Sequence, residues 1–358
     1  MNKPIIVVGP IPPPLYGLSS VNSAVINYLS QRGASTYVFS TASTKIGRAL
    51  YIKLRRGLLV FLQLWNFYKC IRSFGGSEFS LYMSVSSGYG QLFESLFAVI
   101  ARLFNASIVL HHHSFLYLNN SSAITKFLFC CCGKNVVHVV LCDIMYQKLK
   151  QNYQSITHVI KISNAVFIKG MDNFRARSDL TTIGFIGNIE GDKGIYEFLE
   201  ILRLLQKGNI KIGGVIAGPF FDNETKIRVL SFVNKLSNVS YIGPIYGNEK
   251  IQYFNSIDAL IYPTKNDAEP LTIIESMSCG VPILARSRGC INEMVTSQAG
   301  AVIDFKDDFI SVAIDYLRVW STKPETFIEK SKGAFARHKN MRISSMEALE
   351  NLYSVLTT

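Results

Sequence analysis

Three acidic residues lie close together where a polar loop gives way to an apolar helix pattern, between residues 266 and 280. Asp267 and Glu275 are eight positions apart, with Glu269 between them. A helix that begins after such a loop offers unpaired backbone N–H groups and the positive end of its dipole, and both favour a phosphate. The carboxylates beside it can accept hydrogen bonds from sugar hydroxyls. The segment therefore predicts a site for a phosphorylated sugar.

This arrangement resembles the Glu-x7-Glu element of retaining glycosyltransferases of the GT-B fold, in the glycogen-synthase-like superfamily (glycosyltransferase family 4, group 1). The resemblance implies that Glu275 contacts the ribose of a nucleotide. The spacing places Asp267 in the register of the family's first glutamate, so we expect it to contact the transferred sugar. Glu269, six residues before Glu275, is the alternative. The plainer interpretation is that Glu275 caps a helix and that the other two are loop charges.

Pro270 stands where the family often has a glycine, directly before the helix. Proline has no backbone N–H and cannot donate to a phosphate. The amides expected to face the phosphates are therefore those of Leu271 and Thr272.

The motif Gly187-Asn188-Ile-Glu-Gly-Asp-Lys193-Gly follows an apolar strand pattern. It resembles the family's Gly-Arg…Lys-Gly pattern, in which Arg and Lys neutralise the departing nucleoside diphosphate. Negative charge grows on that leaving group, so fixed cations stabilise the transition state more than the ground state. Lys193 keeps this role by the resemblance, whereas Asn188 replaces the Arg. Either Lys193 acts alone or Arg286 or Arg288 assists it; the alternative is a solvated loop lysine.

A loop at residues 9–20 places glycine and hydroxyl groups between the first strand pattern and a helix. Gly17 is the position where backbone can come closest to an anion, because no Cβ blocks the approach. The loop resembles the family's glycine-bearing N-terminal loop, which lies next to the donor diphosphate.

Three consecutive histidines end a strand pattern of the first half, followed by Ser114. Side chains alternate direction along a strand, so the three cannot bind one metal together. The resemblance implies that one of them lies beside the transferred sugar. His113 is the first choice and His111 the second, and His112 is expected to face the other way.

Weaker matches follow in the family's order. The segment Tyr241-Ile-Gly-Pro-Ile245 resembles the strand and turn whose backbone reads the nucleotide base, which implies a backbone contact at Ile245. Pro263-Thr264 resembles the Pro-Ser before the acidic loop, and residues 289–293 continue as in bacterial polysaccharide enzymes. Because the base is read through backbone, the sequence does not identify it.

Strand patterns alternate with helix patterns in two series, which predicts parallel sheets covered on both faces. The fold class is thus α/β. The resemblance implies two Rossmann-like domains facing a cleft, with a C-terminal helix crossing back to the first domain. We expect an acceptor-binding domain at residues 1–165, a nucleotide-sugar-binding domain at 166–340 and the returning helix at 341–358. The expected strands are at residues 4–8, 34–40, 79–85, 107–111, 136–141 and 157–162, then 182–187, 212–217, 239–242, 259–262 and 282–285.

The composition is that of a globular protein: 358 residues, of which 48% are hydrophobic and 17% charged. No secretory signal is visible at the start, so we expect a cytoplasmic location. Through Cys142 the chain has twelve Lys or Arg and two acids, which gives +10 of the net +12. No nucleic-acid-binding motif accompanies this charge. The densest basic cluster is Lys45, Arg48, Lys53, Arg55, Arg56, Lys69 and Arg72.

An apolar stretch at residues 57–65 lies inside this basic cluster and is shorter than the about 20 residues that span a bilayer. It suits a helix on an anionic membrane surface, with Trp65 and Tyr68 at the headgroups. The alternative is an ordinary packed helix with solvated cations.

The sequence thus predicts a retaining hexosyltransferase that moves a sugar from a nucleotide-sugar to a polyprenyl-diphosphate-linked or oligosaccharide acceptor, at the inner membrane face. It needs no cofactor beyond the donor. No Asp-x-Asp lies on a suitable loop, so metal independence is expected. The alternatives are a nucleotide-sugar epimerase of the same fold and a non-catalytic membrane-associated scaffold. The donor sugar, the acceptor and the oligomeric state are not determined by the sequence.

Overall fold

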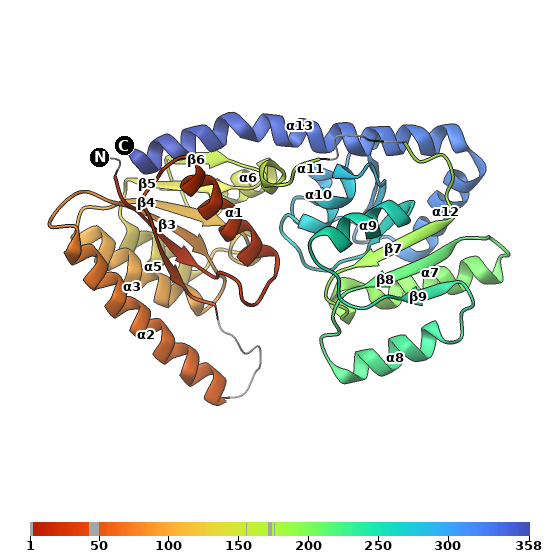
Figure 1. Cartoon of the computed structure of the whole chain (residues 1–358), viewed down its shortest axis with the longest axis horizontal. Coiled ribbons are helices and arrows are strands. Elements are labelled where there is room, and N and C mark those ends of the chain that lie inside the picture. The colour runs from red at the N-terminus through yellow and green to blue at the C-terminus, as the bar shows by residue number, and fades with distance from the viewer. Residues whose placement is uncertain (1–2, 43–49, 155, 171–173, 175) are drawn as a thin grey trace. The chain divides into compact units, whose positions relative to one another are not determined.

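A computed structural model describes residues 3–42, 50–154, 156–170, 174 and 176–358, without the side chains of residues 50–57, 59 and 60 (Figure 1). The chain divides into two compact units. Unit 1 comprises Met1–Phe167 with Ser344–Thr358, and unit 2 comprises Ile168–Ile343. Each contains a six-stranded parallel sheet with helices, so the predicted α/β class is confirmed.

The sheet of unit 1 has the order β2-β1-β3-β4-β5-β6. Strands β1 and β3 are buried along their whole length, as expected where helices cover both faces. The order reverses between β1 and β3, and ligands of such sheets bind outside the carboxyl ends at that point. The strands are β1 Ile5–Gly9, β2 Thr36–Ser40, β3 Ser80–Val85, β4 Ser107–His112, β5 Val136–Val140 and β6 His158–Lys161.

Helices α2, α3 and α5 of unit 1 lie on one side of its sheet, with α3 packed against both of the others (Figure 1). Phe67 of α2 and Phe97 of α3 are fully buried, with ring centroids 5.1 Å apart. The helices of this unit are α1 Gly17–Gln31, α2 Leu50–Ser73, α3 Gly90–Leu103, α4 Leu116–Asn119, α5 Ala123–Cys132, α6 Asp143–Asn152 and the 3-10 turn η1 Asn164–Phe167.

The sheet of unit 2 has the order β12-β11-β10-β7-β8-β9 and reverses between β7 and β10. Its strands are β7 Thr182–Ile186, β8 Gly213–Ala217, β9 Val239–Tyr241, β10 Ala259–Tyr262, β11 Ile283–Arg286 and β12 Gly300–Ile303. Its helices are η2 Gly191–Lys193, α7 Ile195–Lys207, α8 Asn223–Val233, α9 Asn248–Ser256, α10 Leu271–Ser278, α11 Ile291–Met294, α12 Phe309–Thr322 and the first part of α13 Pro324–Thr357.

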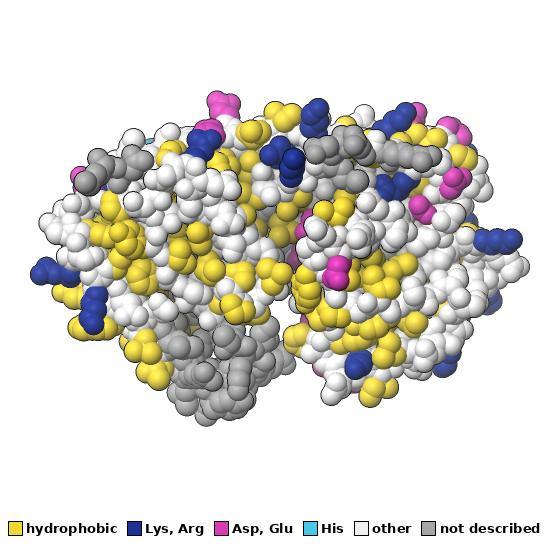
Figure 2. Space-filling model, in the orientation of Figure 1, with side chains coloured by type: hydrophobic (Ala, Val, Ile, Leu, Met, Phe, Trp, Pro, Cys, Tyr) yellow, Lys and Arg dark blue, Asp and Glu magenta, His cyan; other side chains and the backbone are white. Residues whose placement is uncertain are grey.

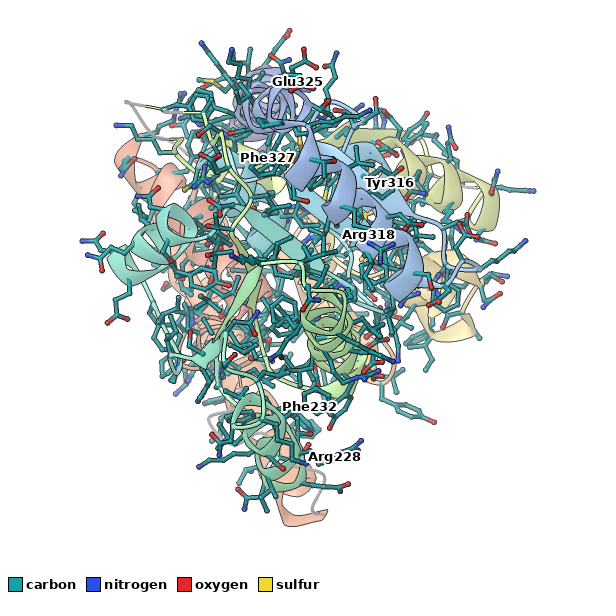
Figure 3. The ribbon with its side chains drawn as sticks, turned by 90° about the vertical axis from the view of Figure 1, so that its right-hand side faces the viewer. Arg228, Phe232, Tyr316, Arg318, Glu325 and Phe327 are labelled. Carbon is teal, nitrogen blue, oxygen red and sulfur yellow. The ribbon has the colours of Figure 1, made fainter. Side chains whose placement is uncertain are left out.

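Aromatic side chains fill the core beneath α7 and α12. Trp320 of α12 is buried, with its ring centroid 6.1 Å from Tyr316 and 5.8 Å from Phe327. Figure 3 shows the labelled Tyr316 and Phe327 on α12 and the start of α13.

Two elements differ from the sequence expectation. β12 carries no alternating pattern long enough to stand out, and the last helix begins at Pro324 instead of at residue 341. Proline is favoured at a first helical position, where a missing N–H costs nothing. Within the basic cluster, Lys45 and Arg48 and the side chains of Lys53, Arg55 and Arg56 lie outside the described residues. Lys69 and Arg72 are exposed.

Candidate functional site

Two loops of unit 2 meet at the carboxyl edge of its sheet, where the strand order reverses. One, residues 187–194, follows β7, and the other, residues 263–270, follows β10. The N–H of Lys265 donates to the carbonyl of Asp192 at 2.8 Å. Gly194 has φ +84°, and a Cβ there would lie 2.4 Å from Pro263 Cγ. Only glycine allows this close packing, so the sequence holds the two loops together.

Asp267 is fixed by three donors that converge on one carboxylate oxygen. Its Oδ2 accepts from Lys193 Nζ at 2.7 Å, and from Tyr262 Oη and Thr264 Oγ1 at 2.9 Å each. The side chains of Lys193 and Asp267 are 24% and 21% exposed, so the ion pair is partly desolvated. Burial raises the pKa of Tyr262, and the negative charge of Asp267 adds to the shift. The predicted sugar contact and the predicted phosphate cation therefore lie side by side.

The surroundings of Glu269 differ from those of Asp267. It is 6% exposed, and its charge acts on Arg337 of α13. Burial lowers the pKa of Arg337, and the charges of Glu293 and Glu269 oppose that shift. Arg337 also donates to the carbonyls of Met294, at 3.1 Å, and Glu293. The two rival carboxylates thus have different surroundings, and that of Asp267 contains the predicted phosphate cation.

The start of α10 has free donors. Within the described part of the chain, the N–H groups of Leu271 and Thr272 have no protein acceptor, and both residues are half-buried. Glu275 comes one turn later and on the same face as Leu271. A diphosphate at the helix start and a ribose at Glu275 would therefore be neighbours.

Glu275 has a partner that the sequence analysis did not identify. Lys250 of α9 donates to both carboxylate oxygens, at 2.5 Å to Oε1 and also to Oε2. Burial raises the pKa of Glu275, and Lys250 opposes the shift. No local motif marks Lys250; its position follows only from the packing of α9 beside α10.

The backbone around Asn188 is open toward the same edge. Gly187 has φ +153° and no heavy atom within 4 Å of a Cβ placed on it. Asn188 is exposed and, among the described residues, makes no hydrogen bond. A Cβ on Gly218 would lie 1.8 Å from the carbonyl oxygen of Gly187, so the position after β8 also requires glycine. Ile245, beyond β9, is half-buried, and no described residue hydrogen-bonds its backbone N–H or carbonyl.

Arg286 and Arg288 are both engaged with protein groups. Arg286 is buried, with its guanidinium 3.6 Å from Glu197 and 4.8 Å from the ring centroid of Phe309. Arg288 donates to the carbonyl of Lys265 at 3.0 Å and lies over the ring of Phe305. Their interactions support the loop after β10.

Gly17 is exposed and is the first residue of α1 in unit 1, after the loop that follows β1. A Cβ placed on it would meet no atom of the described residues within 4 Å. Two buried side chains support the loop: Ser19 Oγ accepts from the N–H of Tyr16 at 2.9 Å, and Asn22 Nδ2 donates to the carbonyl of Pro10 at 2.9 Å. The backbone before α1 is therefore ordered and open.

The three histidines alternate as predicted. His111 and His113 share one side of the strand end, with ring centroids 4.0 Å apart, and the Nε2 atom of each is buried with no hydrogen bond to a described residue. His111 Nδ1 pairs with Tyr82 Oη. His112 faces the other side, where its Nε2 lies 2.9 Å from His138 Nδ1. Burial lowers the pKa of His113 to about 3.

Two other features are absent from the described residues. No cluster of His, Cys, Asp and Glu there could hold a metal ion. None of the helices in that part is long and apolar enough to cross a membrane.

An apolar surface lies on α2 and α3 of unit 1. On α3 the exposed side chains are Leu92, Leu96, Val99 and Leu103, one helical face. On α2 they are Leu58, Phe61, Leu62, Trp65 and Tyr68. Lys69 lies 5.1 Å from the ring centroid of Trp65. Figure 2 shows hydrophobic side chains at the surface of this unit, beside Lys and Arg.

The family model of glycosyl transferases group 1 matches residues 166–333. Those residues belong to this family. They contain the site residues of unit 2 that the sequence predicts, from Gly187 to Arg288. This group 1 domain, together with unit 1, has the GT-B fold, since solved GT-B structures match almost the whole chain.

Two solved structures illustrate the match. The sucrose-phosphate synthase of Thermosynechococcus elongatus superposes with a TM-score of 0.72 and 13% identity, covering 99% of this chain and 100% of that one. The Anabaena protein Alr3699/HepE, solved in complex with UDP, gives a TM-score of 0.68 and 13% identity, covering 98% and 100%.

Curated relatives share shorter segments. The capsular polysaccharide biosynthesis glycosyltransferase CapM of Staphylococcus aureus is 22% identical over 137 residues, which are 38% of this chain and 36% of CapM. The lipopolysaccharide core biosynthesis mannosyltransferase LpsB of Rhizobium meliloti (strain 1021) is 23% identical over 177 residues, 45% of this chain and 47% of LpsB. The chain thus spans less than half the length of these relatives.

Proposed function

We propose that this protein is a retaining glycosyltransferase of family 4, which moves a sugar from a nucleotide-sugar to a lipid-linked or oligosaccharide acceptor in the synthesis of cell-surface polysaccharide. The observation that carries the proposal is the start of α10, where two free amides lie between Asp267 with its lysine and Glu275. The named relatives make capsule or lipopolysaccharide, and HepE binds UDP. UDP-sugars are therefore the first donors to try.

The chemistry follows from these groups. The amides of Leu271 and Thr272 and the ammonium of Lys193 stabilise the charge that grows on the leaving diphosphate. The bond from the anomeric carbon to the phosphate oxygen breaks while a bond to the acceptor oxygen forms on the same face. The acceptor proton passes to the departing diphosphate. Lys193 supplies positive charge without a metal, so turnover is expected to persist in EDTA.

The decisive experiment compares Glu275→Ala with the wild type in donor turnover. We expect the variant to remain folded, with a lower thermal unfolding temperature because Lys250 loses its partner, and to lose nucleoside diphosphate release. Normal turnover by a folded variant would overturn the assignment. Diphosphate release that needs no acceptor and yields an epimerised sugar would favour an epimerase. A wild type that binds no nucleoside diphosphate in calorimetry would favour a scaffold.

We further propose that the enzyme works at the inner membrane face, where a polyprenyl-diphosphate acceptor would be found. The apolar side chains on α2 and the cations Lys69 and Arg72 support this location, because an anionic surface attracts cations and takes up aromatic side chains.

A further inference from the structure

Lys250 occupies a place that is unfavourable for a cation. It is the third residue of α9, in the first turn, where the helix dipole presents its positive end. Its ammonium is also only partly hydrated, since the side chain is 28% exposed. Glu275 offsets both effects by accepting from Lys250 with each carboxylate oxygen.

The pair leaves Glu275 able to bind a ligand. A carboxylate has about four lone-pair positions, two on each oxygen. The lysine uses one on each oxygen, so each oxygen retains an acceptor position. Two neighbouring hydroxyls of a ribose present two donors with matching spacing. Lys250 can thus fix the carboxylate without occupying it fully.

The two helices that carry the pair are joined at their far ends. Arg177 donates to the carbonyls of Phe254 and Cys279 at 2.6 Å each and of Ile257 at 2.9 Å. These carbonyls end α9 and α10, so one guanidinium sets the spacing of both helices. The distance between Lys250 and Glu275 is therefore a property of the fold of unit 2.

We infer that Lys250 is a positioning residue for nucleotide binding, which keeps Glu275 ionised and oriented toward the two ribose hydroxyls. This inference rests on the proposed function, because it needs a nucleotide at α10. It also predicts a sugar preference: the site favours a ribonucleotide over its 2′-deoxy counterpart only while the pair is intact.

The test is calorimetric titration of the full chain with UDP, GDP and ADP, and then with the 2′-deoxy form of whichever binds, at pH 6 and pH 8. We expect Lys250→Met to weaken ribonucleotide binding on the order of tenfold, as for loss of a hydrogen bond to a charged group. The loss is expected to be larger at pH 6, because Glu275 without its cation titrates at a higher pH. The preference over the deoxy form is expected to vanish.

Lys250→Arg keeps a cation and should restore the wild-type pH dependence. Lys207→Met, which removes an exposed lysine of the same unit, is the matched control. Circular dichroism checks folding, and Lys250→Arg carries the pH comparison if Lys250→Met does not fold. Two outcomes would overturn the role of Lys250 and leave the proposed function intact. One is a Lys250→Met variant that keeps the wild-type preference over the deoxy nucleotide and the wild-type pH profile of binding. The other is a folded Lys250→Arg variant whose pH profile of binding differs from that of the wild type. Absence of any nucleotide binding by the wild type would instead overturn the proposed function with it.

Discussion

Asp267 and Lys193 form an ion pair, 2.7 Å from Oδ2 to Nζ, that joins the loop after β10 to the loop after β7. Both side chains are only about one-fifth exposed. The pair therefore orders the acidic loop before any ligand arrives. The ammonium of Lys193 is thus already paired with a carboxylate. A bound diphosphate and Asp267 would both have to interact with this ammonium.

Asp267→Asn removes the charge and keeps the shape of the side chain. Because three donors lose a charged acceptor, we expect the free energy of unfolding to fall by about 1–3 kcal/mol and donor turnover to fall at least about tenfold. Chemical denaturation and a diphosphate-release assay measure the two effects. Glu269→Gln is the comparison, because Glu269 interacts electrostatically with Arg337. We expect Glu269→Gln to lower the free energy of unfolding and to leave donor binding unchanged. If Glu269→Gln weakened donor binding more than Asp267→Asn does, Glu269 would be the sugar contact.

Two glycine substitutions separate ligand approach from folding. At Gly17 a Cβ meets nothing, so Gly17→Ala should leave thermal unfolding unchanged and reduce turnover only if an anion comes close. At Gly289, with φ +52°, a Cβ would lie 2.2 Å from the carbonyl oxygen of Asp267. Gly289→Ala should therefore displace the acidic loop and lower both the unfolding temperature and turnover. Full activity in Gly17→Ala would remove that loop from the donor site.

The parallel sheets and the positions of the loops could be read from the sequence, because apolar strand patterns and glycine-bearing loop motifs are local features. Gly194 and the start of α10 are examples. The partners of the carboxylates could not be read in this way. Lys250 meets Glu275 through the packing of two helices, and Tyr262 meets Asp267 through the path of the loop. Such contacts depend on the folded path of the chain, which no spacing in the sequence encodes.

The buried histidines predict a pH dependence of stability. Burial lowers the pKa of His113 and of His138 to about 3, so both stay neutral in the folded chain down to acidic pH. Unfolded histidine has a pKa of about 6.5. Below about pH 6.5 the unfolded state therefore binds more protons than the folded state. The stability that is present above about pH 6.5 is lost as the pH falls through this range. From pH 7.5 to 5.5 each histidine should remove about 1.4 kcal/mol from the free energy of unfolding.

Denaturant unfolding at the two pH values measures this loss, and His138→Gln should reduce it by one histidine's share. The imidazole NMR signals of His113 and His138 in the folded protein should not titrate between pH 5 and 8. A signal from His113 that titrates near 6.5 would contradict the burial of this cluster.

The exposed face of α2 predicts membrane binding that depends on both apolar and charged groups. Phe61 and Trp65 are 60% and 57% exposed, and full burial of such a side chain is worth about 1.5–3 kcal/mol. We expect the protein to sediment with phosphatidylglycerol vesicles and much less with phosphatidylcholine vesicles, because nearby cations add about 1 kcal/mol each. Phe61→Ser with Trp65→Ser should weaken this binding at least about tenfold. The control is Ile227→Ser on α8 of unit 2, a side chain of similar exposure, which should bind as the wild type. Equal sedimentation of the wild type and the double variant would show that the exposed face of α2 does not contact the membrane.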